Sequence, residues 1–206
     1  MGCPGSGKGT QIKRILSKYP NVSTVSSGDE LRSNVYRKTQ IGINVEKTMK
    51  AGNLVSDEII TEIMLQKLRH LNSSWITDGF PRTLKQAGSL SLSHKIDFVI
   101  NLDVPWKVIL DRIENRWVHS PSGRTYNLTF NPPIESGRDD VTGELLTKRG
   151  DDNVSTALFR LQEYQNLTVP LINYYEKGGI LHNFKGESSD EITPNLMAVL
   201  AELLGK

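Results

Sequence analysis

The sequence has little cysteine, no marked excess of either charge and no long hydrophobic run. Its single cysteine, Cys3, excludes an intrachain disulfide and a zinc site made of cysteines. The 25 basic residues nearly balance the 23 acidic ones, so any anion-binding site must be local and a nucleic-acid partner is not expected. No apolar run approaches the roughly 20 residues that span a bilayer. We therefore expect a soluble protein without a membrane partner.

Short apolar or β-branched segments alternate with longer helical patterns. This alternation predicts an α/β fold in three layers, with a parallel sheet and helices on both faces. The predicted strands are 22–25, 75–77, 98–102 and 180–183, and the predicted helices are 8–18, 29–37, 44–51, 56–71, 106–116, 154–176 and 190–204. The segment 119–152 does not follow this alternation, because it contains prolines, glycines and short polar turns. This composition predicts a small β-rich insertion.

The segment 2–10, Gly-Cys-Pro-Gly-Ser-Gly-Lys-Gly-Thr, fits the phosphate-binding pattern G-x4-G-K and leads directly into a helical pattern. In such a loop the backbone N–H groups surround phosphate oxygens, the helix N-terminus adds its positive end, and the lysine reaches the β- and γ-phosphates. Gly9 separates Lys8 from the hydroxyl of Thr10, which departs from the usual pattern. The segment predicts a nucleoside triphosphate site made of Gly5, Ser6, Gly7, Lys8, Gly9 and Thr10.

The Gly9-Thr10 pair and the string Asp78-Gly79-Phe80-Pro81-Arg82 with Gln86 resemble the adenylate kinase family of the long-lid type. The resemblance runs nearly end to end, and segments 123–133 and 99–105 look most like its mitochondrial GTP:AMP phosphotransferase branch. It implies a P-loop NTPase fold with core segments 1–26, 57–116 and 154–206, an AMP-binding helical insert at 27–56 and a lid at 117–153. It also implies a monomer in the mitochondrial matrix.

The resemblance further implies how AMP is bound. Ser27 and Arg32 would hold its phosphate, the segment 53–55 would face its adenine, and Gln86 would read the adenine edge. The implied AMP-binding set is Ser27, Arg32, Asn53, Leu54, Val55, Gly79, Phe80, Pro81, Arg82, Gln86, Arg149 and Arg160.

On the donor side the resemblance implies that Arg112 stacks on the base and Arg116 contacts the phosphates. The implied donor set beyond the loop is Arg112, Arg116, Thr125, Tyr126 and Ser188, and the implied catalytic set is Lys8, Asp78, Arg82, Arg116, Arg149 and Arg160. Asp78 would organise Mg²⁺ through water. Phosphoryl transfer asks mainly for alignment and charge compensation, which the planar arginine fork provides well.

In the lid, His119, Ser122, Asp139 and Thr142 occupy the spacing at which other family members carry zinc-binding cysteines. Hydroxyl groups are poor zinc ligands. We therefore expect a hydrogen-bonded cluster without metal in the lid, and Mg²⁺ with the nucleotide as the only cofactor.

The donor base is less well specified. Many relatives that use ATP carry a histidine at position 127, where this sequence has Asn127. We expect GTP to be the donor, with ITP or ATP as alternatives, and AMP to be the acceptor. A kinase for a monophosphate of another base is the nearest rival, and a nucleic-acid-binding P-loop protein is disfavoured because no basic stripe is present.

The resemblance fails at one place. Family members carry an apolar strand directly before the phosphate loop, and this sequence has only Met1 there. Burying such a strand would contribute roughly 1.5–3 kcal/mol for each of its apolar side chains. Two expectations follow: the printed start is internal to a longer chain, or this form is a truncated, inactive nucleotide-binding protein.

Overall fold

The computed structural model describes residues 1–148 and 154–204. Its strands are β1 (Ser23–Ser26), β2 (Trp75–Asp78), β3 (Val99–Asp103), β4 (Arg116–His119), β5 (Arg124–Asn127) and β6 (Leu181–Lys185). Its helices are α1 (Lys8–Lys18), α2 (Ser27–Tyr36), α3 (Gln40–Lys50), α4 (Asp57–Arg69), α5 (Leu84–Ser91), α6 (Trp106–Glu114), α7 (Val154–Glu163), the π-helical turn η1 (Tyr164–Thr168), α8 (Val169–Lys177) and α9 (Ser189–Leu204). The α/β class is confirmed.

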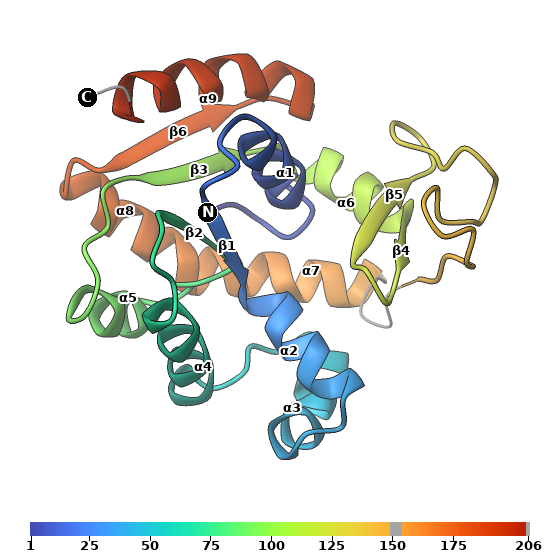
Figure 1. Ribbon diagram of the computed structural model, residues 1–206, viewed down its shortest axis with the longest axis horizontal. Coiled ribbons are helices and arrows are strands. Elements are labelled where there is room, and N and C mark those ends of the chain that lie inside the picture. Colours follow the sequence, from blue (N-terminus) through green and yellow to red (C-terminus); the bar gives the residue numbers. More distant parts are fainter. Residues whose placement is uncertain (149–153, 205–206) are drawn as a thin grey trace.

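The core strands pair in parallel, as predicted. β1 pairs with β2, and β3 pairs with β6, so the pairing forms two sheets of two strands. The start of the chain lies between β3 and β2 in Figure 1, and Gly2 makes a single parallel bridge to Leu102 of β3. Helix α9 covers one side of the β3–β6 pair and α8 the other (Figure 1), and both contact β6.

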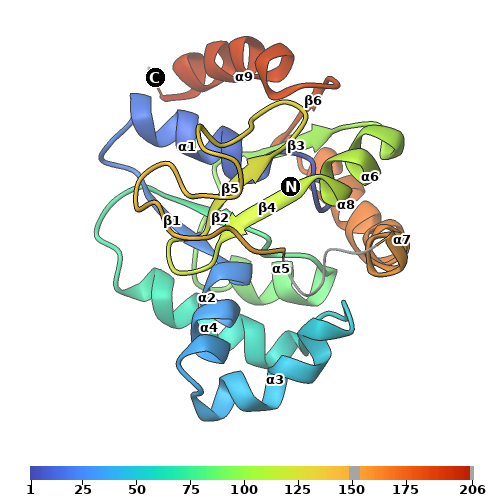
Figure 2. The same cartoon turned by 90° about the vertical axis from the view of Figure 1, so that its right-hand side faces the viewer.

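Local capping determines where several helices begin. The Ser26 hydroxyl accepts a hydrogen bond from the N–H of Asp29, and Thr39 caps α3 in the same way through Gly42. Both helices therefore start earlier than the sequence pattern predicted, because a hydroxyl acceptor satisfies an N–H group that the first turn leaves unpaired. These two helices and α4 gather at the end of the molecule away from α9 (Figure 2).

Two predictions about helices were wrong. Helix α5 was missed, although Thr83 caps it by accepting from the N–H of Gln86 at 3.1 Å. The single helix predicted over 154–176 is divided by η1, and Pro170 lies in the first turn of α8. Proline has no N–H and its ring clashes with the preceding turn of a regular helix, so the backbone widens there.

Two large hydrophobic clusters hold these elements. One lies around Ile109, Leu161 and Leu196, all at 0% exposure, and packs α6, α7 and α9 together. The other centres on Met64 and Leu68 of α4 and extends to Leu31 of α2. The antiparallel pair β4–β5 opens the insertion that projects on the right in Figure 1. Within the described ranges, no helix is both long and apolar enough to cross a bilayer.

Candidate active site

The glycine-rich loop has the backbone that phosphate binding requires. Gly5 and Gly7 have φ values of 83° and 92°, in the left-handed region that favours glycine. A Cβ atom on Gly7 would lie 3.0 Å from the hydroxyl of Ser189. Helix α1 then starts at Lys8 without a side-chain cap in the part of the chain that is described, so its first N–H groups point into the loop. Gly9 and Thr10, in the first turn, are exposed.

Lys8 is folded back over this loop. Its Nζ donates to the carbonyl oxygens of Gly2 at 2.8 Å and Cys3 at 2.7 Å. Burial lowers the pKa of Lys8, an effect that the nearby carboxylate of Asp78 opposes and the charge of Arg116 reinforces. Arg116, at the start of β4, is therefore close enough to act on the loop lysine electrostatically.

Two buried polar atoms at this place lack a partner. Among the described residues, Ser6 Oγ and Asp78 Oδ1 are shielded from solvent and make no hydrogen bond. Buried polar atoms without a hydrogen-bond partner are rare in folded proteins, so each of these two needs a specific reason. Asp78 ends β2, and an unpaired carboxylate oxygen is the type of group that binds Mg²⁺ or its coordinated water. The residues present thus fit a magnesium ion held beside the loop.

Three guanidinium groups converge next to Asp78. Burial lowers the pKa of Arg82, and the charges of Arg160 and Arg32 lower it further while Asp78 raises it. Arg82 follows β2, Arg32 belongs to α2 and Arg160 to α7, so three separate parts of the fold bring these cations together. Gathering like charges costs electrostatic free energy unless an anion compensates them. The arrangement therefore suits a polyanionic ligand.

Each of the three arginines is held by a neighbouring group. Arg82 Nε donates to the carbonyl of Gly79 at 2.8 Å, and Arg32 pairs with the carboxylate of Asp29 at 2.5 Å. Arg160 Nε lies 3.5 Å from the carbonyl oxygen of Gly52. The Arg82 carbonyl also accepts from Thr168 of η1 at 3.2 Å, a contact that sequence reasoning did not find.

Gly79 allows the loop after β2 to pack against α2. Its φ is 71°, and a Cβ atom there would lie 2.7 Å from the hydroxyl of Ser27 and 2.9 Å from Arg82 Nη2. Ser27 is buried and donates to the Gly79 carbonyl at 2.8 Å. The predicted phosphate-binding hydroxyl and Arg82 therefore share one carbonyl acceptor, which sets their relative position.

The other predicted AMP residues lie around the same insert. Gln86 is buried. Its Oε1 accepts from the Arg82 N–H at 2.7 Å and its Nε2 donates to Asp57 at 2.6 Å, so one amide hydrogen remains for a ligand.

Asn53 follows α3, Val55 is buried in the cluster around Met64, and Leu54 is half-buried. Phe80 is buried and Pro81 follows it through a cis peptide bond. Arg149 lies outside the described residues.

Arg112 links the phosphate loop to the turn before α9. Its guanidinium is buried and donates to the carbonyls of Gly5 at 3.2 Å and Glu187 at 2.7 Å, and burial lowers its pKa. The ring of Phe130 covers it, with the Arg112 Cζ 5.3 Å from the ring centroid. The hydroxyl of Ser188 accepts from the N–H of Glu191 at the start of α9. Sequence reasoning missed Phe130.

Asn127 and Tyr126 are turned inward. Asn127 is buried, donates to the Arg112 carbonyl at 3.1 Å and accepts from the Thr129 hydroxyl at 2.6 Å. It thus fixes the lid onto α6, and its amide does not project as a neighbour of a base. The Tyr126 hydroxyl donates to Asp139 at 2.9 Å inside the lid, whereas Thr125, the residue before it in β5, is half-buried.

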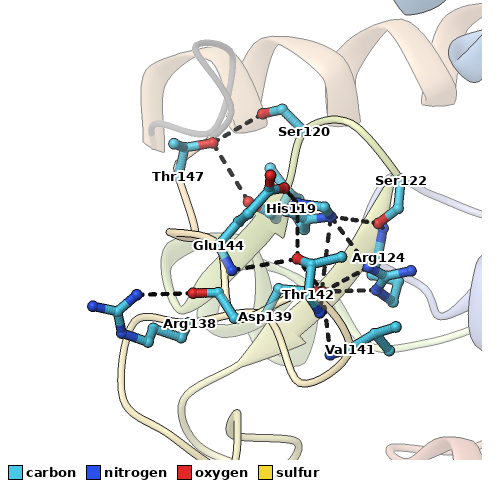
Figure 3. A network of polar contacts seen from close by, with 12 residues as sticks. His119, Ser120, Ser122, Arg124, Arg138, Asp139, Val141, Thr142, Glu144 and Thr147 are labelled. Carbon is cyan, nitrogen blue, oxygen red and sulfur yellow. Dashed lines mark hydrogen bonds and ion pairs between the residues drawn. The ribbon is translucent and has the colours of Figure 1, made fainter.

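The predicted hydrogen-bonded cluster in the lid is confirmed (Figure 3). His119 is 2% exposed; its Nδ1 bonds the Ser122 hydroxyl at 2.7 Å and its Nε2 bonds the Glu144 carboxylate at 2.5 Å. Thr142 lies 3.4 Å from the same Nε2. Glu144 was not predicted, because nothing in its spacing separates it from an ordinary surface acid.

Asp139 is the acceptor at the centre of the lid (Figure 3). Arg124 donates to its two oxygens at 2.7 and 2.6 Å, and the N–H and hydroxyl of Thr142 donate at 2.9 and 3.0 Å. The Arg124 guanidinium holds the pKa of Asp139 well below its usual range. In the described part of the chain, no group of three or more histidine, cysteine or acidic side chains is placed to hold a metal ion.

The lid should therefore loosen in acid. A carboxyl group whose pKa is lowered by folding stabilises the fold fully above its ordinary pKa of about 3.9, and this stabilisation is lost progressively as the pH falls further. We expect the NMR amide signals of Val141 and Thr142, which donate to Asp139, to shift toward disordered values only when the pH falls well below about 3.9. In Asp139→Asn the lid should already be loosened at pH 7. Wild-type signals for these two amides in Asp139→Asn at pH 7 would contradict this.

Known proteins resemble the whole chain. The adenylate kinase family model matches residues 1–180. A mitochondrial GTP:AMP phosphotransferase of Saccharomyces cerevisiae is 43% identical over 215 residues, covering 100% of this chain and 92% of the relative. One of Drosophila melanogaster is 45% identical over 195 residues, covering 94% and 90%. An adenylate kinase of Sodalis glossinidius is 43% identical over 206 residues, covering 98% and 95%.

A glycine-rich phosphate loop beside converging arginines and the buried carboxylate of Asp78 defines a nucleotide phosphotransferase. The chain belongs to the adenylate kinase family, a family of nucleoside monophosphate kinases with a P-loop NTPase fold.

Proposed function

We propose that this protein transfers the γ-phosphoryl group of GTP to AMP, giving GDP and ADP. The convergence of Arg32, Arg82 and Arg160 beside the phosphate loop carries the proposal, since it offers a second phosphate site next to the first. Relatives from yeast and fly are named GTP:AMP phosphotransferase, which supports GTP as the donor. The bacterial relative is named adenylate kinase at a similar identity, so ATP is the second candidate donor.

The proposed roles follow from position. The loop N–H groups and Lys8 bind the donor phosphates, and the Lys8 ammonium moves from its own loop carbonyls to the phosphate oxygens. Arg82, with Arg32 and Arg160, holds the AMP phosphate and compensates the charge of the transferred group. Arg116, which already acts on Lys8 electrostatically, contacts the donor phosphates, and Arg149 joins when the lid closes. Closure also excludes water that would otherwise hydrolyse the donor. No general base is required because alignment and charge do most of the work.

Mg²⁺ is proposed as the cofactor, with Asp78 holding it through water. The partnerless Oδ1 of Asp78 supports this assignment. When bound, the ion neutralises charge on the donor phosphates. The lid is proposed to work without zinc, because two of the four positions at the zinc spacing are hydroxyls already engaged in hydrogen bonds. Stoichiometric zinc in the purified protein would contradict this part.

The identity of the donor can be tested directly. We expect initial rates at fixed AMP to give a kcat/KM for GTP roughly tenfold or more above that for ATP, with ITP close to GTP, because base discrimination depends on a few hydrogen bonds. The GTP:ATP ratio cancels differences in the amount of active protein. A preference for ATP would overturn the choice of donor and leave the kinase assignment intact, whereas binding of both nucleotides without ADP formation would indicate an inactive nucleotide-binding protein.

The cellular setting is proposed from the same relatives. Both GTP:AMP phosphotransferases described above are named mitochondrial, which supports a mitochondrial site for this protein and, as the finer proposal, the matrix. We also propose that it acts as a monomer on small-molecule nucleotides. Sedimentation of the purified chain at the mass of a dimer would contradict the monomer.

A further inference from the structure

The side-chain amide of Gln86 is held between a donor and an acceptor. Its Oε1 accepts from the backbone N–H of Arg82 at 2.7 Å, and its Nε2 donates to Oδ1 of Asp57 at 2.6 Å. The Gln86 side chain is buried. A backbone N–H can only donate and a carboxylate can only accept. The two partners therefore specify which end of the amide is the oxygen and which is the nitrogen.

The backbone of Arg82 is a fixed reference for this amide. Its N–H is bonded to Gln86, and its carbonyl accepts from the hydroxyl of Thr168 at 3.2 Å. Thr168 is buried and ends η1, the π-helical turn between α7 and α8. The peptide groups on both sides of Arg82 thus cannot turn to suit a rotated Gln86 amide without breaking one of these bonds.

Asp57 is fixed by a second hydrogen bond. Its Oδ2 accepts from the hydroxyl of Thr83 at 2.9 Å, and the Thr83 hydroxyl accepts in turn from the backbone N–H of Gln86 at 3.1 Å. A hydroxyl has one hydrogen, which here goes to Asp57. The three residues form a closed ring of hydrogen bonds that joins the first turn of α4 to the start of α5.

The amide still offers one acceptor and one donor position. A carboxamide has two lone pairs on its oxygen and two hydrogens on its nitrogen, and Arg82 and Asp57 use one of each. Since the proposed function places Arg82 on the phosphate of AMP, the base of the same nucleotide is the ligand within reach. Adenine carries an amino group beside ring nitrogens that accept, and a carboxamide pairs with both. Hypoxanthine carries a carbonyl oxygen in place of that amino group.

We propose that Asp57 is a positioning residue that makes the acceptor site specific for adenine over hypoxanthine, by fixing the orientation of the Gln86 amide. The proposal rests on the proposed function, because it takes AMP as the acceptor. A free amide could turn over to suit either base. Here, turning it over would bring Oε1 against the Asp57 carboxylate and Nε2 against the Arg82 N–H, so two pairs of like groups would meet in a buried place.

The test compares AMP and IMP as acceptors at a fixed concentration of donor. We expect the wild type to favour AMP in kcat/KM by about 10³ or more, because a site with oriented buried hydrogen-bonding groups rejects a mismatched ligand strongly. In Asp57→Ala the AMP:IMP ratio should fall by about tenfold or more, mainly through a higher KM for AMP. A purely structural role would lower the rates with both acceptors alike and leave the ratio unchanged.

The matched control is Glu58→Ala. Glu58 is the next residue in the first turn of α4, is exposed and pairs with Lys85, so its loss removes the same charge from the helix start without touching Gln86. Its AMP:IMP ratio should equal that of the wild type. Asp57→Asn keeps an oxygen that can accept from Nε2 and should retain most of the ratio.

NMR of the wild type gives a readout that needs neither turnover nor a variant. One side-chain amide proton of Gln86 should exchange slowly in the free protein, and the other should shift on addition of AMP but not of IMP. Two equally exchanging protons, or a ratio in Asp57→Ala within about twofold of that in Glu58→Ala, would overturn the proposal. A wild type that forms no ADP from AMP would overturn the proposed function instead, and the NMR result would still decide the role of Asp57.

Discussion

Replacing Arg82 by methionine is expected to lower kcat/KM for phosphoryl transfer to AMP by about 10³, because a preorganised cation that compensates transferred charge is worth 10²–10⁵ in rate. Folding should be retained. The Gly79 carbonyl that Arg82 contacts also accepts from Ser27, so it stays satisfied, and the repulsion among Arg82, Arg32 and Arg160 is relieved. We therefore expect Tm to be unchanged or raised while activity collapses.

Two further variants make this result specific. Arg82→Lys keeps the charge but loses the planar fork, and should recover only part of the rate. Arg69→Met removes an exposed arginine at the end of α4 and should leave kcat/KM unchanged. An Arg82→Met enzyme within threefold of wild type would remove Arg82 from the reaction.

Much of the fold could be predicted from local signals, and the exceptions have physical causes. Helix α1 has the predicted bounds because the glycine loop and the periodic apolar residues act within one segment. Helix α5 was missed because Gly88, Ser89 and Ser91 are weak helix formers. Its start depends on Thr83, whose hydroxyl bonds Asp57 of α4 at 2.9 Å, a partner that a local pattern cannot show.

The residues of the site likewise divide into those that a local sequence pattern predicts and those that depend on contacts with another element. The loop lysine could be assigned from the sequence because its function depends on neighbours along the chain. The roles of Phe130 and Asn127 could not, since each acts through Arg112, a residue of another element. In the lid, the carboxylate of Asp139 depends on Arg124, which lies on β5, so its environment is defined only once the lid is folded.

The loop that carries Lys8 is held from two directions. Met1 exchanges hydrogen bonds with Ile100 and Leu102 of β3, and Gly2 makes a parallel bridge to Leu102. Arg112 of α6 donates to the carbonyl of Gly5.

Asp78→Asn is the second substitution with a large expected effect, a fall in kcat of about 10²–10³. Asparagine keeps the shape but loses the charge of the one partnerless buried carboxylate oxygen among the described residues, so Mg²⁺ should be held more weakly and the rate should saturate at higher Mg²⁺. The substitution also removes the carboxylate that raises the pKa of Lys8 and of Arg82. The two buried cations then lack a compensating charge, so Tm should fall. Rates measured against Mg²⁺ concentration test this.

The matched control is Asp97→Asn, an exposed acid paired with Lys95, for which rate and magnesium dependence should be unchanged. The two consequences of Asp78→Asn are separable, because the loss of Tm is present without nucleotide or metal and the loss of rate is not. A wild-type magnesium dependence together with a lowered Tm would show that Asp78 only compensates Lys8 and Arg82. A wild-type rate would remove it from the reaction altogether.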